Sequence, residues 1–142
     1  MERLLVAGVL LIGAVALALV LRRRQPDEPV RTSWAVPTWL DRADFSSPST
    51  PWLVVVFTSA TCRSCQDTLD KAQPLASAEV TVEEAEVGAR PEVHERYGIE
   101  AVPTVVIADA EGAVRGSFIG PPTSAELWAR VAEARGDGSI ER

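Results

Sequence analysis

Two cysteines, Cys62 and Cys65, are the residues of this 142-residue chain whose type and spacing could do chemistry. They lie with two residues between them in the stretch TSATCRSCQD, after an apolar run and at the start of a predicted helix. Residues three apart share one face of a helix, so the two sulfurs can close a small disulfide. The start of a helix carries partial positive charge and free N–H groups, which stabilise a thiolate at Cys62. The sequence therefore predicts thiol–disulfide exchange, in which Cys62 attacks and Cys65 resolves the mixed disulfide.

A metal site and a structural staple are the competing interpretations of the cysteine pair. A structural zinc site normally needs four ligands, and the chain offers two cysteines and a single histidine, His94. His94 stands in a charged, predicted helical stretch, where we expect it to face solvent. A disulfide across two intervening residues closes too small a loop to stabilise the fold much. The context of strand, loop, cysteine pair and helix favours redox chemistry, and we predict neither a metal ion nor a cofactor.

Hydrophobic patterning predicts strands and helices in alternation around the cysteines. Residues 52–57 (WLVVVF) form a continuous apolar run, which is typical of a strand covered on both faces. The helix that starts near Ser64 should kink or end at Pro74. The other expected elements are strands at 80–87, 102–109 and 113–120, helices at 89–98 and 124–136, and a hairpin turn at 109–112. This order predicts an α/β domain with a mixed central sheet and helices on both faces.

The segment ahead of this pattern is less regular. Residues 34–45 (WAVPTWLDRADF) predict a short strand and a turn of helix, interrupted by Pro37. The four tryptophans of the chain lie outside the cysteine stretch. We expect all four to be packing residues: Trp34, Trp39, Trp52 and Trp128.

The N-terminal residues have the composition of a membrane anchor. Residues 4–21 carry no charge, and their number suits a helix that spans a bilayer. The run is longer than the apolar part of a typical signal peptide, although small residues at 14–18 resemble a cleavage site. We predict a retained anchor at 1–24, a linker at 25–33, a domain at 34–136 and a flexible tail at 137–142. Residues 22–24 are all arginine, so the positive-inside rule places the domain in the cytoplasm; the alternative places it outside.

The charge of the chain beyond the anchor argues against one class of partner. From Pro26 onward there are 10 Lys and Arg against 19 Asp and Glu, a net charge of −9. The phosphates of a nucleic acid would repel such a domain, and no basic patch with interleaved aromatic residues offsets this. We therefore expect no nucleic-acid binding.

Three stretches together resemble the thioredoxin family, specifically membrane-tethered bacterial thioredoxin-like proteins. FTSATCRSC matches the family's active-site loop, RYGIEAVPT is similar to its segment ending in Pro-Thr, and Gly120 falls where the family has a glycine after its last strand. The likeness covers about residues 34–135. It implies a thioredoxin-like fold in which Pro103 is a cis-proline facing the cysteines. It further implies that Val102, Pro103 and Thr104 shape a groove for an extended substrate segment.

The active-site stretch departs from the family pattern at its variable positions. Thr61 stands where the family commonly has Trp, and Arg63 and Ser64 replace the usual Gly-Pro. The Arg63 guanidinium adds a cation beside the thiolate and should lower the pKa of Cys62 further, unless solvent screens it. A more stable thiolate makes the dithiol a poorer reductant, so we expect a potential above that of ordinary thioredoxins.

A further departure concerns the proton of Cys65. The family carries a buried Asp just before its strand-end Phe, and here that place is Val56, most simply a core residue. The family's partner lysine aligns with Glu84, which could act as a replacement base or could simply be an exposed strand residue.

These observations predict a thiol–disulfide oxidoreductase that exchanges disulfides with protein partners and draws electrons from an unidentified donor. At the cytoplasmic side of a bacterial inner membrane it would rest as a dithiol and act as a reductase. Two alternatives stay open. One is a redox-sensing or partner-binding module with little turnover, and the other is an extracytoplasmic thiol oxidoreductase in cytochrome or envelope protein maturation.

Overall fold

The computed structural model describes residues 1, 13–15 and 34–137, and it divides the chain into two units, Met1–Thr32 and Ser33–Arg142. Most of the predicted anchor, the whole linker and residues 138–142 of the predicted tail lie outside the described residues. Residues 13–15 are helical. No helix within the described ranges is long and apolar enough to cross a membrane. The second unit carries the cysteines.

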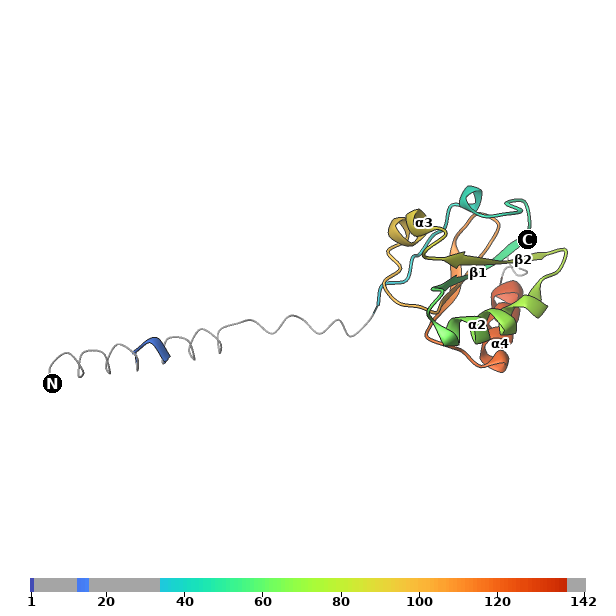
Figure 1. Cartoon of the computed structure of the whole chain (residues 1–142). Helices are drawn as coiled ribbons and strands as arrows, with labels where there is room; N and C mark the ends of the chain where they lie inside the picture. Colours follow the sequence, from blue (N-terminus) through green and yellow to red (C-terminus); the bar gives the residue numbers. More distant parts are fainter. Residues whose placement is uncertain (2–12, 16–33, 138–142) are drawn as a thin grey trace. The chain divides into compact units, whose positions relative to one another are not determined.

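A four-stranded mixed sheet forms the centre of the second unit (Figure 1). Its strands are β1 (Trp52–Thr58), β2 (Val80–Glu86), β3 (Thr104–Ala108) and β4 (Val114–Ile119), in the order β2-β1-β3-β4. Strand β1 pairs parallel with β2 and antiparallel with β3, which in turn pairs antiparallel with β4. A parallel pair needs a crossover connection, and α2 (Arg63–Ala72) lies within it. The predicted mixed α/β sheet is confirmed.

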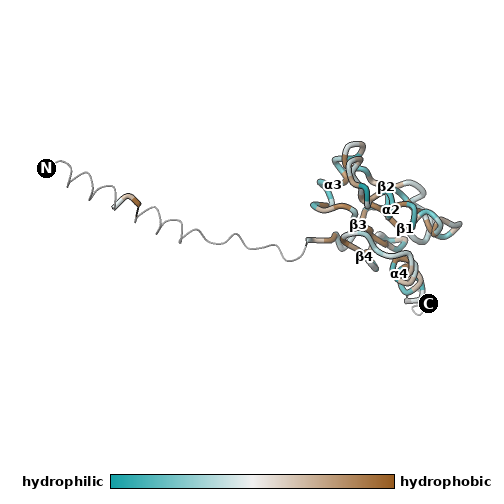
Figure 2. Tube along the Cα trace, turned by 60° about the horizontal axis from the view of Figure 1, so that its bottom comes forward, coloured by the Kyte–Doolittle hydropathy of each residue, from teal (hydrophilic) through white to brown (hydrophobic). Residues whose placement is uncertain are grey.

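Strand β1 is buried on both faces because apolar side chains fill both of its alternating rows. Val54 and Val56 face a cluster completed by α2 and α4 (Ser124–Asp137), which includes Leu69 and Leu127. The opposite row packs into a second cluster with α3 (Pro91–Arg96) and the N-terminal segment. Figure 2 shows the hydrophobic colour along strands that pass between these layers. Helices therefore cover both faces of the sheet, as predicted.

The helix boundaries lie within two residues of the predicted ones, and α3 (Pro91–Arg96) is shorter than the predicted 89–98. Helix α2 ends at Ala72, and Pro74 lies in the following short 3-10 helix Gln73–Leu75. The sequence predicts that the last helix opens with Ser124, but the N-cap residue of α4 is Thr123. Thr123 Oγ1 accepts from the Glu126 N–H at 3.2 Å, and the Glu126 carboxylate accepts from the Thr123 N–H at 2.8 Å. This reciprocal pair is a capping box.

The segment ahead of β1 has less regular structure than the predicted short strand and turn of helix. The expected early strand is reduced to one antiparallel bridge between Trp39 and Ala113, and the turn of helix is the 3-10 helix Arg42–Asp44. Arg42 is buried, and its guanidinium donates to the carbonyl oxygens of Asp109 at 2.7 Å and Thr50 at 2.9 Å. These bonds attach the segment to the end of the sheet that lies away from the cysteines.

The packing prediction for the tryptophans is correct only for Trp52, which packs against the cluster under α2. Trp34, Trp39 and Trp128 are 45%, 52% and 47% exposed. Two of them are held by their indole N–H groups instead. Trp39 donates to the Glu111 carbonyl at 2.9 Å, and Trp128 donates to the Lys71 carbonyl at 3.0 Å. A tryptophan whose indole N–H is bonded to a carbonyl can be held in place while much of its ring stays exposed to water.

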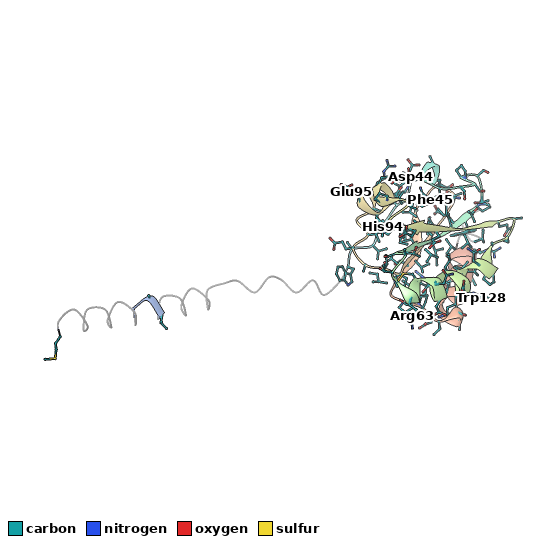
Figure 3. All side chains as sticks on the ribbon, in the orientation of Figure 1. Asp44, Phe45, Arg63, His94, Glu95 and Trp128 are labelled. Atoms are coloured by element: carbon teal, nitrogen blue, oxygen red, sulfur yellow. A yellow bond between two sulfur atoms is a disulfide. The ribbon has the colours of Figure 1, made fainter. Side chains whose placement is uncertain are left out.

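The prediction that His94 faces solvent is wrong. His94 is 6% exposed, and its ring meets Phe57 edge-on with 5.3 Å between the ring centroids. Its Nε2 lies 2.7 Å from the Ala85 carbonyl oxygen, and because a carbonyl only accepts, Nε2 carries the proton. The histidine therefore joins α3 to β2 in the core on the face of the sheet opposite α2 (Figure 3).

Candidate active site

The two cysteines lie at the start of α2 and are joined by a disulfide, with their Cα atoms 5.3 Å apart. Cys62 is the N-cap residue, and Cys65 lies within the first turn. Cys62 is half-buried, whereas Cys65 is 2% exposed. A partner in solution can therefore reach the outer sulfur, while the inner sulfur faces the core. This difference in exposure fits the predicted roles of attacking and resolving cysteine.

The N-terminus of α2 is suited to hold a thiolate. Cys62 makes no side-chain capping bond, and the first turn contains no acidic residue. The unpaired N–H groups of this turn and the partial positive charge of the helix end therefore have no competing anion on the helix itself. Arg63 is exposed at the first helical position, and no ion pair within residues 34–137 engages it (Figure 3). In the reduced protein, the Cys62 sulfur is the group best placed to take up negative charge here.

The loop before β3 lies at the same edge of the sheet as the cysteines, because Thr104 pairs with Phe57 near the end of β1. The Val102–Pro103 peptide bond is cis, as the resemblance implied. Pro103 is buried, and its carbonyl accepts from the Gly120 N–H at 2.8 Å. Thr104 is 4% exposed and donates its hydroxyl to the Ala101 carbonyl at 2.8 Å. The topology therefore brings the predicted groove residues to the edge that carries the disulfide.

Glu86 is a site residue that sequence reasoning missed. This carboxylate, at the end of β2, accepts from the Ala60 N–H at 3.0 Å and from the Ala89 N–H at 2.9 Å. It thereby ties the loop that leads into Cys62 to the turn after β2. The N–H of Gly88, and those of Ala60 and Ala89, lower the pKa of Glu86. Only the pairing of β1 with β2, which sets Thr58 opposite Glu86, reveals this contact.

No protein-family model and no curated protein matches the chain. Among solved structures it is similar to thioredoxin from Fasciola hepatica, with 24% identity and a TM-score of 0.54 over 61% of this chain and 84% of that one. It is also similar to oxidized mitochondrial thioredoxin 3 from Saccharomyces cerevisiae, at 22% identity and a TM-score of 0.52 over 61% and 81% of the chains. A mutant thioredoxin from Halobacterium salinarum gives 22% identity and a TM-score of 0.52 over 60% and 75% of the chains.

The chain has a thioredoxin fold. The likeness establishes the architecture of the second unit, and the fold that the motifs implied is confirmed. The cysteine pair at the start of α2 and the cis-proline loop at the same sheet edge are features of this chain's own geometry. They give the thioredoxin fold of this chain a site at which thiol chemistry is possible.

This thioredoxin fold has no acid at Val56, which is fully buried in the cluster under α2. Glu84 is the β2 residue paired with Val56, and it is exposed, as the simpler of the two interpretations expected. Its carboxylate nevertheless accepts a hydrogen bond of 2.6 Å from the Thr58 hydroxyl, and Thr58 is 1% exposed. The sequence contained no signal for this contact, which joins the exposed edge strand to a buried residue beside the cysteine loop.

Metal binding is another chemistry open to a pair of cysteines. Within the part of the chain that the structure describes, no group of three or more His, Cys, Asp and Glu side chains is arranged to hold a metal ion. His94 belongs to the α3 side of the sheet, whereas the cysteines open α2 on the other side. The structure therefore does not bring His94 to the cysteine pair.

Replacing Glu86 by Gln should cost stability at neutral pH and make the remaining stability less sensitive to acid. A carboxyl group whose folded pKa is depressed adds stability above its unfolded pKa and loses it as pH falls through the folded pKa. The gap in urea midpoint between wild type and Glu86→Gln should therefore be full at pH 7. It should shrink once the pH drops below the ordinary value of 4.5.

Glu95→Gln is the matched control, because Glu95 is an exposed residue of α3 whose carboxylate makes no hydrogen bond within residues 34–137. This variant should follow the wild-type urea midpoint at each pH. A gap for Glu86→Gln that stays constant from pH 7 to pH 3 would contradict the role assigned to its backbone N–H partners.

Proposed function

We propose that this protein is a thiol–disulfide oxidoreductase that reduces disulfides in protein partners. The observation that carries the proposal is the Cys62–Cys65 disulfide at the start of α2, in which Cys62 is half-buried and Cys65 is buried. A dithiol and a disulfide at this place are two states of one reaction cycle. The thioredoxin fold supports the proposal, because it supplies the strand, loop and helix that position the pair.

The reaction proceeds through a mixed disulfide. The Cys62 thiolate attacks one sulfur of a substrate disulfide, which releases the other substrate sulfur as a thiolate. Cys65, as a thiolate, then attacks the Cys62 sulfur and expels the second substrate sulfur. The substrate gains two electrons, and the protein closes its Cys62–Cys65 bond. An electron donor, itself a dithiol system, must return the pair to the reduced state.

The loop before β3 would hold the substrate through its main chain. Val102 is half-buried and makes no backbone hydrogen bond within residues 34–137. Its N–H and C=O can therefore pair with an extended segment of the substrate. Pro103 and Thr104, both buried, fix the position of this backbone at the sheet edge. We propose that Val102, Pro103 and Thr104 form the substrate-binding loop.

We also propose that residues 4–21 anchor the protein in a bacterial inner membrane with the domain on the cytoplasmic side. The charge-free run and the arginines at 22–24 support this arrangement. A reducing cytoplasm would keep the pair as a dithiol and give it the direction of a reductase. A reporter fused to the C-terminus should be active only if the reporter works in the cytoplasm. Activity of an export-dependent reporter instead would favour oxidation or maturation of envelope proteins.

Insulin reduction tests the enzymatic proposal. The purified full-length chain in detergent, supplied with dithiothreitol, should precipitate insulin faster than dithiothreitol alone. Cys62→Ser should lose this activity, because no outer sulfur attacks the substrate. Cys65→Ser, reduced and then mixed with insulin after the dithiothreitol has been removed, should instead accumulate a mixed disulfide that is visible on a non-reducing gel, because neither Cys65 nor a reductant resolves it.

The opposite result would favour a redox-sensing module. If wild type reacts once with a disulfide but does not turn over, the cysteines record redox state rather than transfer electrons repeatedly. If Cys62→Ser retained wild-type activity, the assignment of Cys62 as the attacking residue would be wrong.

A further inference from the structure

The proton on Cys65 poses a problem that the proposed function leaves open. Cys65 must lose this proton before it can resolve the mixed disulfide, because the thiolate is the nucleophile. At 2% exposure its sulfur has little contact with bulk water. Desolvation also disfavours the charged form of a thiol. An inference about the path of this proton rests on the proposed function and deepens it.

Thr58 and Cys65 belong to the facing sides of β1 and α2. The buried stripe of α2 runs through Cys65, Leu69 and Ala72, and the row of β1 that faces it runs through Val54 and Val56. One helical step from Leu69 back to Cys65 covers about 6 Å. A strand step of two residues along the same β1 row covers about 6.6 Å. Helix α2 runs antiparallel to β1, so a step from Leu69 back to Cys65 and a step of two residues forward along β1 cover a similar distance in the same direction, toward the loop that holds the cysteines.

Thr58 is the next residue of that β1 row after Val56, so its hydroxyl lies on the face over which Cys65 sits. Thr58 is 1% exposed, and its only side-chain hydrogen bond within residues 34–137 goes to Glu84 Oε1 at 2.6 Å. A hydroxyl that donates its hydrogen retains lone pairs that can accept another. While it donates to Glu84, the Thr58 hydroxyl therefore keeps the capacity to accept a hydrogen bond from a thiol on this face.

Glu84 offers what a proton acceptor needs. It lies on the same face of β2 as Val82, which packs under α2, and it is exposed to water. A proton that reaches its carboxylate can therefore pass on to solvent. Glu86 is two residues further along the same face, but backbone N–H groups occupy both of its oxygens and lower its pKa, which makes it the poorer acceptor.

We propose that Thr58 and Glu84 form a proton relay for Cys65. During resolution the Cys65 S–H gives its proton to Thr58 Oγ1, and the Thr58 hydroxyl proton passes to the Glu84 carboxylate. The Cys65 sulfur then bonds to the Cys62 sulfur as the bond from Cys62 to the substrate sulfur breaks. The substrate leaves as a thiolate and takes a proton from water, and Glu84 releases its proton to solvent.

A stopped-flow reaction of the reduced full-length chain with dithiobis(nitrobenzoate) separates the two steps. The first coloured thiol appears when Cys62 attacks, and the second appears when Cys65 resolves the mixed disulfide. Thr58→Val, which keeps the shape of the side chain but removes the hydroxyl, should slow the second phase about 100-fold at pH 7, the low end of what positioned proton transfer contributes. The first phase should keep its wild-type rate. Thr58→Ser should restore the second phase.

Thr68→Val is the matched control. Thr68 is another fully buried threonine, and its hydroxyl donates to the Ser64 carbonyl within α2 at 2.8 Å rather than to a carboxylate. The second phase of this variant should match wild type. An equal slowing in Thr68→Val and Thr58→Val would mean that lost packing, not proton transfer, controls the rate.

The pH profile tests Glu84 as the acceptor. Glu84→Gln should slow the second phase as Thr58→Val does, and the double variant should be no slower than either single one, because both changes break one path. The deficits should narrow as the pH rises toward and past the pKa of the Cys65 thiol, because the thiol then loses its proton without the relay. A second phase unchanged in Thr58→Val and Glu84→Gln at pH 7, with wild type normal, would overturn the relay alone. A wild type that shows no second phase would instead overturn the proposed function.

Discussion

The placement of α2 directly after β1 is the constraint on which the site depends. Residues 59–62 carry the chain from the end of a fully buried strand to the first turn of a helix that packs back over it. A parallel neighbour, β2, requires this crossover to stay close to the sheet. The helix N-terminus is thereby fixed at one sheet edge, with Cys62 at its outer end and Cys65 turned inward. The partial positive charge of the helix end therefore acts mainly on the Cys62 thiol, whereas burial acts mainly on the Cys65 thiol.

Fixed loops around this edge keep the geometry ready for reaction. The Glu86 carboxylate holds the Ala60 N–H ahead of Cys62, and Gly120 holds the carbonyl of Pro103 on the other side. Both contacts involve main-chain atoms, so they constrain the path of the backbone rather than a particular side chain. Charges of opposite sign flank the loop, since the exposed Arg63 follows Cys62 directly and the Glu86 carboxylate lies at the Ala60 N–H. We propose that Arg63 tunes Cys62 within this balance.

The parts predicted from the sequence are those that depend on local signals. The apolar run of β1, the stop at Pro74 and the cysteine spacing each act within a few residues, and motif likeness placed Pro103. The errors and omissions concern contacts between distant segments. The charged sequence around His94 predicts a surface residue, but contacts with the distant Ala85 and Phe57 bury its ring. The hydrogen bonds of Glu84 with Thr58 and of Glu86 with Ala60 depend on the register between β1 and β2. Exposed tryptophans were misassigned because hydrophobicity alone ignores partners for the indole N–H.

The central claim is that the start of α2 stabilises a thiolate at Cys62, and the pH dependence of alkylation tests it most directly. The full-length Cys65→Ser chain has Cys62 as its single thiol, so its rate of reaction with iodoacetamide reports that sulfur alone. The account predicts a midpoint well below the ordinary thiol value of about 8.5, moved upward in a version that also carries Arg63→Gln. A midpoint at or above about 8.5 in the Cys65→Ser chain, as for an unperturbed cysteine, would contradict the account.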